Sequence, residues 1–224
     1  MKKTFFVTGT DTGVGKTCVT AALLVKAQQT GHSAFGLKPV AAGCSQIDGT
    51  WVNEDTLLIA ENSSVKLPYA QINPIALKAP AAPHLAAAQE GKRLSIDRIE
   101  GLVKGSLMQK ADLRLIEGAG GWRVPLGPSE SMADLPKRLN LPVILVVGMR
   151  LGCLNHALLT AEAIRRDGLH LAGWVGNEIS PELDMANGNF ETLQFCLQAP
   201  CLGRIPYLSS VNVEKCAGFL TLPE

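Results

Sequence analysis

Short apolar runs alternate with longer helix-period segments along this sequence. Six runs have the length of strands, and several of them are continuous and leucine-rich or β-branched, as buried strands tend to be: Thr4–Thr8, Ser33–Lys38, Leu113–Glu117, Pro142–Gly148, Leu171–Asn177 and Cys201–Ile205. Six further segments have helical spacing: Lys16–Gln29, Asn53–Glu61, Pro83–Glu90, Ser95–Gln109, Asn155–Arg166 and Asn187–Leu197. The alternation predicts an α/β fold with a doubly wound, mostly parallel sheet and helices on both faces.

The predicted helices carry recognisable signals at their ends. Lys16–Gln29 is apolar almost all round and is therefore expected to lie deep in the fold. Pro83 suits the first turn of a helix, because proline lacks the N–H that would be unpaired there. Gly31 and Gly168 suit helix stops.

The remaining segments have little periodicity. Ala41–Val52 and Ser63–Pro83 are rich in turn-forming residues and are expected to be loops beside the sheet, and Leu208–Glu224 has only a weak pattern. The sequence has no internal repeat or low-complexity linker, so residues 1–224 are expected to form a single domain. Ligands of open α/β sheets bind at loops beyond the strand ends, where functional residues are expected.

Composition narrows the class of protein. Hydrophobic residues make up 46% of the 224 residues and charged residues 18%, which is typical of a globular chain. The formal net charge of +1 creates no long-range field that favours nucleic acid or an anionic membrane. The apolar run Leu141–Val147 is too short to span a bilayer. We expect a cytoplasmic protein with no nucleic-acid or membrane partner.

The cysteines indicate free thiols. The six are Cys18, Cys44, Cys153, Cys196, Cys201 and Cys216. None forms a C-x-x-C pair, and no histidine or cysteine cluster has the spacing of a zinc site. Scattered cysteines of this kind are expected to be buried and reduced.

The segment Gly9-Thr10-Asp11-Thr12-Gly13-Val14-Gly15-Lys16-Thr17 joins the first predicted strand to the first predicted helix. This context indicates a phosphate-binding loop (P-loop), and hence a P-loop NTPase-like fold, because the N–H groups of such a loop converge on phosphate oxygens. Lys16 would reach the β- and γ-phosphates, and the Thr17 hydroxyl would bind Mg²⁺. The usual pattern has glycine where Thr10 stands, so a glycine-rich turn remains the alternative. The predicted nucleotide-binding residues here are Gly13, Val14, Gly15, Lys16, Thr17 and Cys18.

Two carboxylates are candidates for a second anchor of Mg²⁺. Glu117 ends a predicted buried strand and is followed by the small residues Gly118, Ala119 and Gly120, which leave room for phosphate. Asp55 follows the first long loop. Either acid is alternatively a carboxylate that stabilises a helix start. With Thr17, these two acids form the predicted metal set.

Lys38 ends the second predicted strand, directly before Pro39. Since strand ends of a parallel sheet share one edge, Lys38 is expected to point toward the γ-phosphate near Lys16. Two lysines converging there would stabilise the charge of a phosphoryl group in transfer. A solvated lysine at a strand end is the alternative.

Two further strand ends carry candidate binding residues. Asn177 ends a predicted strand, where an amide could contact an adenine edge or merely tie loops together, and Pro206 lies in a possible apolar wall. The segment Gly152-Cys153-Leu154-Asn155-His156 precedes a helix predicted to begin at about Asn155. Its free N–H groups could bind a carboxylate, or Asn155 could be a simple N-cap.

These segments together resemble one family, the dethiobiotin synthetases of biotin biosynthesis. The residues that carry the resemblance are Val7–Thr17, Gly36–Val40, Asn53–Asp55, Glu117–Trp122, Leu141–Gly148 and Leu151–Ala157. In this family the first glycine of the loop is at the position of Gly9. The resemblance implies that MgATP drives the carboxylation and ring closure of 7,8-diaminononanoate with CO₂, through a carbamate and a carbamic–phosphoric anhydride. The products would be dethiobiotin, ADP and phosphate.

The resemblance also implies roles for individual residues. Thr12, Lys16 and Lys38 would surround the carbamate and the transferring phosphoryl group. Mg²⁺ would be bound by Thr17, Asp55 and Glu117, and adenine by Asn177 with Pro206. The family is a homodimer with its site at the interface, so the far carboxylate of the substrate would be bound by Gly152, Cys153, Leu154 and Asn155 of the partner subunit.

The sequence departs from the family at three places. Ala42 stands where Ser or Thr is usual, so a substrate contact there is either lost or made by the backbone. Arg150 replaces a frequent lysine, and the segment after Tyr207 matches poorly. Two alternative functions stay open: a related P-loop ligase that acts on another carboxylate, and a nucleotide-switched partitioning or maturation ATPase.

Overall fold

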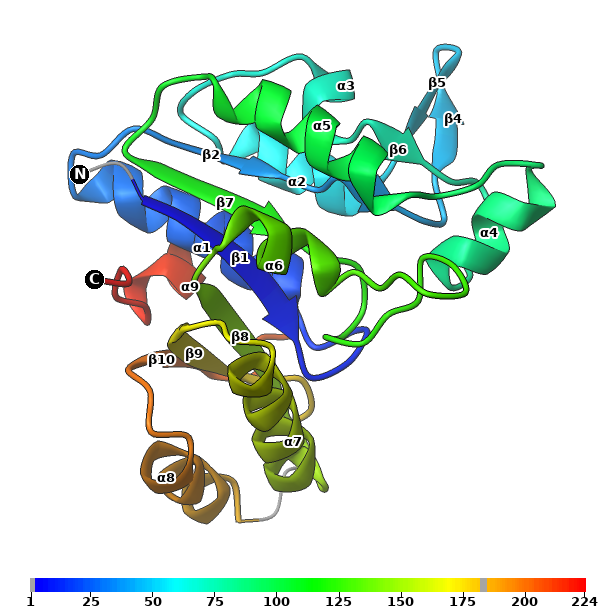
Figure 1. Ribbon diagram of the computed structural model, residues 1–224. Coiled ribbons are helices and arrows are strands. Elements are labelled where there is room, and N and C mark those ends of the chain that lie inside the picture. Colours follow the sequence, from blue (N-terminus) through cyan, green and yellow to red (C-terminus); the bar gives the residue numbers. More distant parts are fainter. Residues whose placement is uncertain (1–2, 182–184) are drawn as a thin grey trace.

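The computed structural model describes residues 3–181 and 185–224, with a parallel sheet at the centre (Figure 1). In the described residues this sheet has six strands in the order β10-β9-β8-β1-β7-β2, and every neighbouring pair is parallel. The strands are β1 (Lys3–Gly9), β2 (Ala34–Leu37), β7 (Leu113–Glu117), β8 (Val143–Met149), β9 (Leu171–Glu178) and β10 (Cys201–Ile205). The predicted α/β fold class is confirmed.

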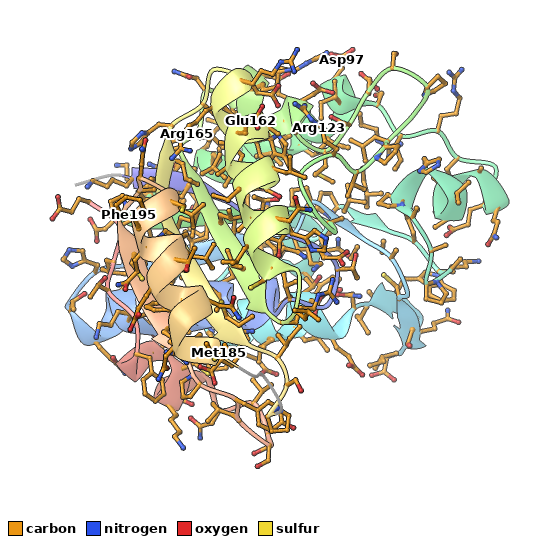
Figure 2. The ribbon with its side chains drawn as sticks, turned by 90° about the horizontal axis from the view of Figure 1, so that it is seen from below. Asp97, Arg123, Glu162, Arg165, Met185 and Phe195 are labelled. Atoms are coloured by element: carbon orange, nitrogen blue, oxygen red, sulfur yellow. The ribbon has the colours of Figure 1, made fainter. Side chains whose placement is uncertain are left out.

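Helices cover both faces of the sheet, which buries two separate apolar cores. One core contains side chains of α1 (Lys16–Gln29), α2 (Glu54–Glu61) and α9 (Val213–Gly218). The other contains side chains of α4 (Pro83–Gln89), α5 (Ile96–Leu107), α6 (Asp134–Leu139), α7 (Cys153–Arg166) and α8 (Ala186–Cys196). Figure 2 shows α7 and α8 side by side over the sheet.

The strand sequences explain why two cores form. Phe5 and Val7 belong to the core of α1, whereas Phe6 between them belongs to the core of α7. Ile144 and Leu145 divide in the same way. Successive side chains of a strand point to opposite faces, so a continuous apolar run is what a strand covered on both sides requires.

The six predicted strands and six predicted helices all occur, with ends shifted by at most a few residues. Gly31 and Gly168 follow α1 and α7 with φ of +79° and +80°, as expected of helix stops. One boundary prediction was wrong: α7 begins at Cys153, two residues before Asn155, and its N-cap is Gly152 in the left-handed region. A glycine adopts that conformation without strain, so the helix starts earlier and Asn155 lies inside its first turn.

Several short elements escaped prediction. The segment Ala41–Val52, expected to be a loop, holds part of β3 (Val40–Ala41) and an exposed hairpin of β4 (Ser45–Ile47) and β5 (Thr50–Val52). The hairpin turns at Asp48-Gly49, both with positive φ, which is a recognised hairpin signal. The second expected loop holds α3 (Tyr69–Ile72) and β6 (Ile75–Ala76), which pairs with β3. α6 and α9 are only six residues long each, too short for a periodic pattern.

Within the described ranges, no helix is both long enough and apolar enough to cross a membrane. The six cysteines are free thiols, as expected, and three of them, Cys44, Cys153 and Cys216, are buried.

Candidate functional site

The candidate site lies at the edge of the sheet where the strands end. β1 ends at Gly9, and β7 beside it ends at Glu117. β2 is the outer neighbour of β7, and Lys38 is the first residue after it. The three strand ends are thus brought together with β7 in the middle (Figure 1). Glu117 is therefore the residue that lies between the phosphate-binding loop and Lys38.

The loop from Gly9 to Gly15 has two glycines in the left-handed region, Gly13 with φ +72° and Gly15 with φ +83°. The carboxylate of Asp11 accepts the N–H of Thr12 at 2.7 Å, and its carbonyl accepts Lys16 Nζ at 2.9 Å. A loop of this shape that leads into α1 directs N–H groups at a common point, which suits an anion.

The shifted position of the first glycine has a packing reason. A Cβ at Gly9 would lie 2.6 Å from a methyl carbon of Val14, which is too close. Val14 itself is buried and fills the space between Gly9 and Gly148. Position 9 therefore needs glycine, whereas Thr10 has room for a side chain, and its hydroxyl accepts the N–H of Gly148 at 3.4 Å.

Lys38 joins the two predicted metal-binding carboxylates. Its Nζ lies 2.6 Å from an oxygen of Asp55 and 2.7 Å from Oε1 of Glu117. The same Glu117 oxygen accepts the Thr17 hydroxyl at 2.8 Å. Glu117 and Lys38 side chains are 0% and 7% exposed, whereas that of Asp55 is 49% exposed. The structure therefore brings all three predicted metal residues, together with Lys38, into one contiguous cluster.

Burial lowers the pKa of both lysines, and only at Lys38 do the neighbouring carboxylates outweigh it. Burial favours the neutral amine of Lys38, but the charges of Glu117 and Asp55 outweigh it and hold the pKa of Lys38 above its usual value. At Lys16 burial is the strongest influence, and the nearby charge of Lys38 adds to it, so the pKa of Lys16 lies below its usual value. An anion bound beside Lys16 would favour its charged form.

Three adjoining cavities run along this edge of the sheet. The central cavity, about 330 Å³, is lined by Thr12, Gly13, Gly15, Lys16, Thr17, Cys18, Lys38, Asp55, Leu58, Glu117, Gly120 and Val211. The asparagine cavity, about 240 Å³, contains Asn177 and Pro206 in its wall and shares Gly13, Gly15, Cys18 and Val211 with the central cavity. The alanine cavity, about 590 Å³, contains Ala42 and Ala119 and shares Thr12, Lys38, Asp55 and Gly120 with the central cavity.

Asn177 packs against the phosphate-binding loop on the side of the asparagine cavity. Its Nδ2 donates to the carbonyl of Val14 at 2.9 Å. A Cβ at Gly15 would lie 2.2 Å from the same nitrogen, so the amide packs directly on the loop backbone. Beside it, Cys18 Sγ lies 3.5 Å from Cys216 Sγ, and burial raises the pKa of the Cys18 thiol to about 12. Asn177 therefore does tie loops together, and it also lines a cavity.

Other predicted site residues lie elsewhere. Gly152, Cys153, Leu154 and Asn155 form the start of α7, and none of them lines the central, asparagine or alanine cavity. Gly118 contacts the core instead, because a Cβ there would lie 2.7 Å from the ring of Phe6.

The donor set suits Mg²⁺. In the described part of the chain, no cluster of three or more His, Cys, Asp or Glu side chains has metal-binding geometry. Mg²⁺ typically takes only one or two protein carboxylates, and water and phosphate oxygens complete its octahedron. Asp55, Glu117 and the Thr17 hydroxyl match that requirement. Oε2 of Glu117 is buried and has no hydrogen-bond partner among the described residues, so a ligand oxygen is available.

Sequence reasoning noted Arg150 only as the replacement for a frequent lysine, and it did not predict the contacts of Arg150, Val211 or Arg123 at the site. Arg150 Nη2 lies 2.5 Å from Asp11 and so ties the end of β8 to the phosphate-binding loop. Val211 lines both the central and the asparagine cavity, and Arg123 lines the alanine cavity. None of these contacts has a local sequence signal, because each joins segments far apart in the chain.

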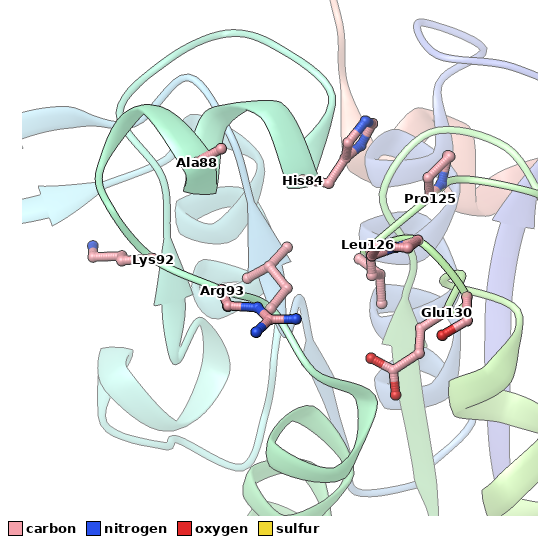
Figure 3. A pocket seen from close by; sticks show the side chains of 11 residues that line it. His84, Ala88, Lys92, Arg93, Pro125, Leu126 and Glu130 are labelled. Atoms are coloured by element: carbon pink, nitrogen blue, oxygen red, sulfur yellow. The ribbon is translucent and has the colours of Figure 1, made fainter.

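A fourth cavity of about 460 Å³ lies beyond Pro125, which also lines the alanine cavity (Figure 3). Its wall includes His84, Arg93 and Glu130, and no predicted site residue.

The sequence relatives compared with this chain carry the same name. A family model described as an AAA domain matches residues 3–215. The chain is 52% identical over 221 residues to the ATP-dependent dethiobiotin synthetase BioD of Cellvibrio japonicus, covering 99% of this chain and 96% of the relative. It is 51% identical over 223 residues to the same-named protein of Marinobacter nauticus, covering 98% and 94%.

Solved structures share the fold at low sequence identity. The septum site-determining protein MinD of Pyrococcus horikoshii, complexed with Mg-ADP, has a TM-score of 0.59 and 19% identity, with 98% of this chain and 87% of that chain covered. The cell division protein FtsY of Thermotoga maritima has a TM-score of 0.55 and 14% identity, with 97% and 68% covered. At these identities the likeness extends to the fold alone.

Proposed function

The chain belongs to the ATP-dependent dethiobiotin synthetase family, and we propose that it closes the ureido ring of dethiobiotin from 7,8-diaminononanoate and CO₂ at the three adjoining cavities. ATP-dependent ligation in biotin biosynthesis is the family activity. The observation that carries the detailed proposal is the shared cavity of Lys16 and Lys38, which opens on one side to Asn177 and on the other to a larger cavity with apolar walls.

The order of the cavities suggests how the substrates are arranged. The triphosphate would occupy the central cavity along the loop, with its adenine in the asparagine cavity between Asn177 and Pro206. The diamine would occupy the alanine cavity, whose walls include Pro80, Ala81 and Val124 and suit a hydrocarbon chain. The reacting groups then meet where the two cavities share Thr12, Lys38 and Gly120.

The reaction proceeds in three steps. One amine of the substrate adds to CO₂ and loses a proton, which gives a carbamate. A carbamate oxygen attacks the γ-phosphorus, the bond to the β-phosphate breaks, and ADP leaves with the bonding electrons. The second amine attacks the carbonyl carbon of the resulting anhydride, the bond from that carbon to the phosphate oxygen breaks, and phosphate leaves as the amine loses a proton and the ring closes. No nucleophilic side chain is required.

The protein contributes positioning and positive charge. Lys16 would contact the β- and γ-phosphates, and Lys38 would contact the carbamate and the transferring phosphoryl group. Cationic donors in a shielded site stabilise the charge shared by the attacking and leaving oxygens. The Thr12 hydroxyl would contact the carbamate, and the hydrogen bond from the Thr12 N–H to the Asp11 carboxylate fixes the backbone beside it. Ala42 has no hydroxyl, so its contact with the substrate would come from the backbone.

Mg²⁺ bound by Thr17, Asp55 and Glu117 would neutralise phosphate charge and orient the γ-phosphate. The Thr17 hydroxyl donates to Oε1 of Glu117, so these two proposed metal ligands are already in contact.

We also propose a cytoplasmic homodimer whose subunits each form one domain over residues 1–224. None of Gly152, Cys153, Leu154 and Asn155 lines the three cavities of its own subunit, which supports a role toward another subunit. Gly152 and Asn155 are exposed there, and N–H groups of the first turn of α7 would bind the substrate's far carboxylate from across the interface.

One assay tests the function. Purified protein is mixed with 7,8-diaminononanoate, bicarbonate, Mg²⁺ and ATP, and ADP and the cyclic urea are measured together. Equal amounts of both, dependent on the diamine, are expected. ATP hydrolysis at the same rate with and without the diamine would favour a nucleotide-switched ATPase instead. ATP hydrolysis that depends on a different carboxylic acid would favour a related ligase.

A further inference from the structure

The position of the Lys38 ammonium coincides with the point on which the proposed metal ligands converge. Its nitrogen lies within 2.7 Å of oxygens from both Asp55 and Glu117. Oε1 of Glu117 is at the same time the acceptor of the Thr17 hydroxyl. In this arrangement a lysine nitrogen is within bonding distance of both carboxylates of the predicted metal set.

Glu117 needs a positive partner in every state of the protein. Its side chain is entirely buried, and an ionised carboxylate withdrawn from water is costly unless it is paired. Lys38 supplies that charge here, at 7% exposure. Lys16 lines the same cavity, but its ammonium donates to the carbonyl of Asp11, and no hydrogen bond joins it to either carboxylate in the described residues.

We propose that Lys38 and the divalent cation are alternative counter-ions for Asp55 and Glu117, so that metal binds tightly only when a nucleotide draws Lys38 away. The inference rests on the metal set of the proposed function. Within the described chain Oε2 of Glu117 is free, but a divalent cation bound to it and to Asp55 would lie beside the positive charge of Lys38. Two cations at one pair of carboxylates repel each other, so each weakens the binding of the other. The γ-phosphate offers Lys38 a new anionic partner while phosphate oxygens complete the metal's ligands.

This exchange makes the binding of the metal ion, the binding of the nucleotide and the position of Lys38 depend on one another. Without nucleotide, a metal ion must bind beside the charge of Lys38 or displace Lys38 from its two carboxylates, so free metal binds weakly. With nucleotide, the displaced ammonium is in the position where it contacts the transferring phosphoryl group. Lys38 would therefore reach the reacting atoms only when metal and nucleotide are both bound, which prevents an incomplete site from forming.

Metal binding without nucleotide tests the proposal directly. Mn²⁺ replaces Mg²⁺, and free Mn²⁺ is measured by electron paramagnetic resonance during titration of the wild type, Lys38→Met, Lys38→Arg and Lys16→Met. Removal of the competing ammonium is expected to tighten Mn²⁺ binding to Lys38→Met by about tenfold, a usual size for coupled sites. Lys38→Arg keeps the charge and is expected to remain weak.

Lys16→Met is the matched control, because it removes one positive charge from the same cavity without touching the carboxylates. Its affinity for Mn²⁺ is expected to change by less than about threefold. Mn²⁺ binding by Lys38→Met that is no tighter than in the wild type or in Lys16→Met would overturn the proposal. Lys38→Gln provides the same comparison if Lys38→Met does not fold. Since no diamine or ATP is present, failure here leaves the proposed reaction to its own assay.

Discussion

The ammonium of Lys38 and the carboxylate of Glu117 form a buried ion pair of 2.7 Å between residues 79 positions apart in the sequence. The pair joins the end of β2 to the end of β7 and places Lys38 in the same cavity as Lys16. Two lysines in one cavity are otherwise unfavourable, because their charges repel. The carboxylates of Glu117 and Asp55 offset that repulsion, and a bound phosphate would offset it further.

Replacing Lys38 tests its role in phosphoryl transfer. Lys38→Ala is expected to lower kcat on the order of 10²-fold or more, since it removes a donor to charge that develops in the transition state. The measurement is steady-state formation of dethiobiotin. Lys104→Ala, an exposed lysine on α5, is the control and should turn over normally. Near-normal turnover of Lys38→Ala would remove Lys38 from the mechanism.

Replacing Lys16 tests the phosphate-binding loop. Lys16→Ala loses a charge-assisted contact to phosphate, so nucleotide affinity is expected to fall by about tenfold or more, and turnover with it. Titration calorimetry with ATP in the absence of diamine measures the affinity. An unchanged ATP affinity would contradict the assignment of Lys16 to the phosphates.

Replacing Gly15 with alanine tests the contact between the phosphate-binding loop and Asn177. An alanine there would be strained at φ +83° and would place its Cβ 2.2 Å from Asn177 Nδ2. Gly15→Ala is expected to destabilise the fold by about 1–3 kcal/mol and to weaken nucleotide binding. Denaturant unfolding measures the stability.

Gly188→Ala is the matched control for that substitution. Gly188 lies inside α8 with nothing within 4 Å of an added Cβ, so alanine should be neutral or stabilising by roughly 0.5–1 kcal/mol. If both variants had the same stability, Gly15 would have no special requirement for glycine.

Asp11 should contribute to the acid sensitivity of the protein. The N–H of Thr12 and then the guanidinium of Arg150 lower the pKa of Asp11. The folded state thus binds the ionised carboxylate better than the unfolded chain does, whose pKa is about 3.9. The resulting stabilisation is present above that pH and is lost as the pH falls through the lower folded value.

Asp11→Asn removes this titration. Its stability is expected to fall less steeply than that of the wild type as the pH decreases from about 5 to 3, in urea unfolding measured across the series. Curves with the same slope would mean that Asp11 does not couple folding to protonation in this range.

The amino-acid sequence was enough to predict the fold class and the long helices and strands. Apolar runs such as Leu113–Glu117 and helical patterns such as Lys16–Gln29 match the structure residue for residue, because each is decided by local periodicity and burial on both faces. The short elements α6 and α9 and the β4–β5 hairpin were not predicted. A six-residue helix has too few turns for a periodic signal, and it forms because the surrounding core accepts its apolar side chains.

The phosphate-binding loop could also be predicted from the sequence alone, since Gly9 to Thr17 are adjacent and the loop is formed by their own backbone. The contacts among Lys38, Asp55 and Glu117 could not, because they arise only in the folded chain. Their contacts depend on β7 lying between β1 and β2, an order that no local pattern specifies. The loop has its first glycine at position 9 and not at position 10. The reason is the packing of Val14 against Gly9, which the sequence alone does not show. Contacts between distant segments follow from strand order and side-chain packing, and those are properties of the assembled fold.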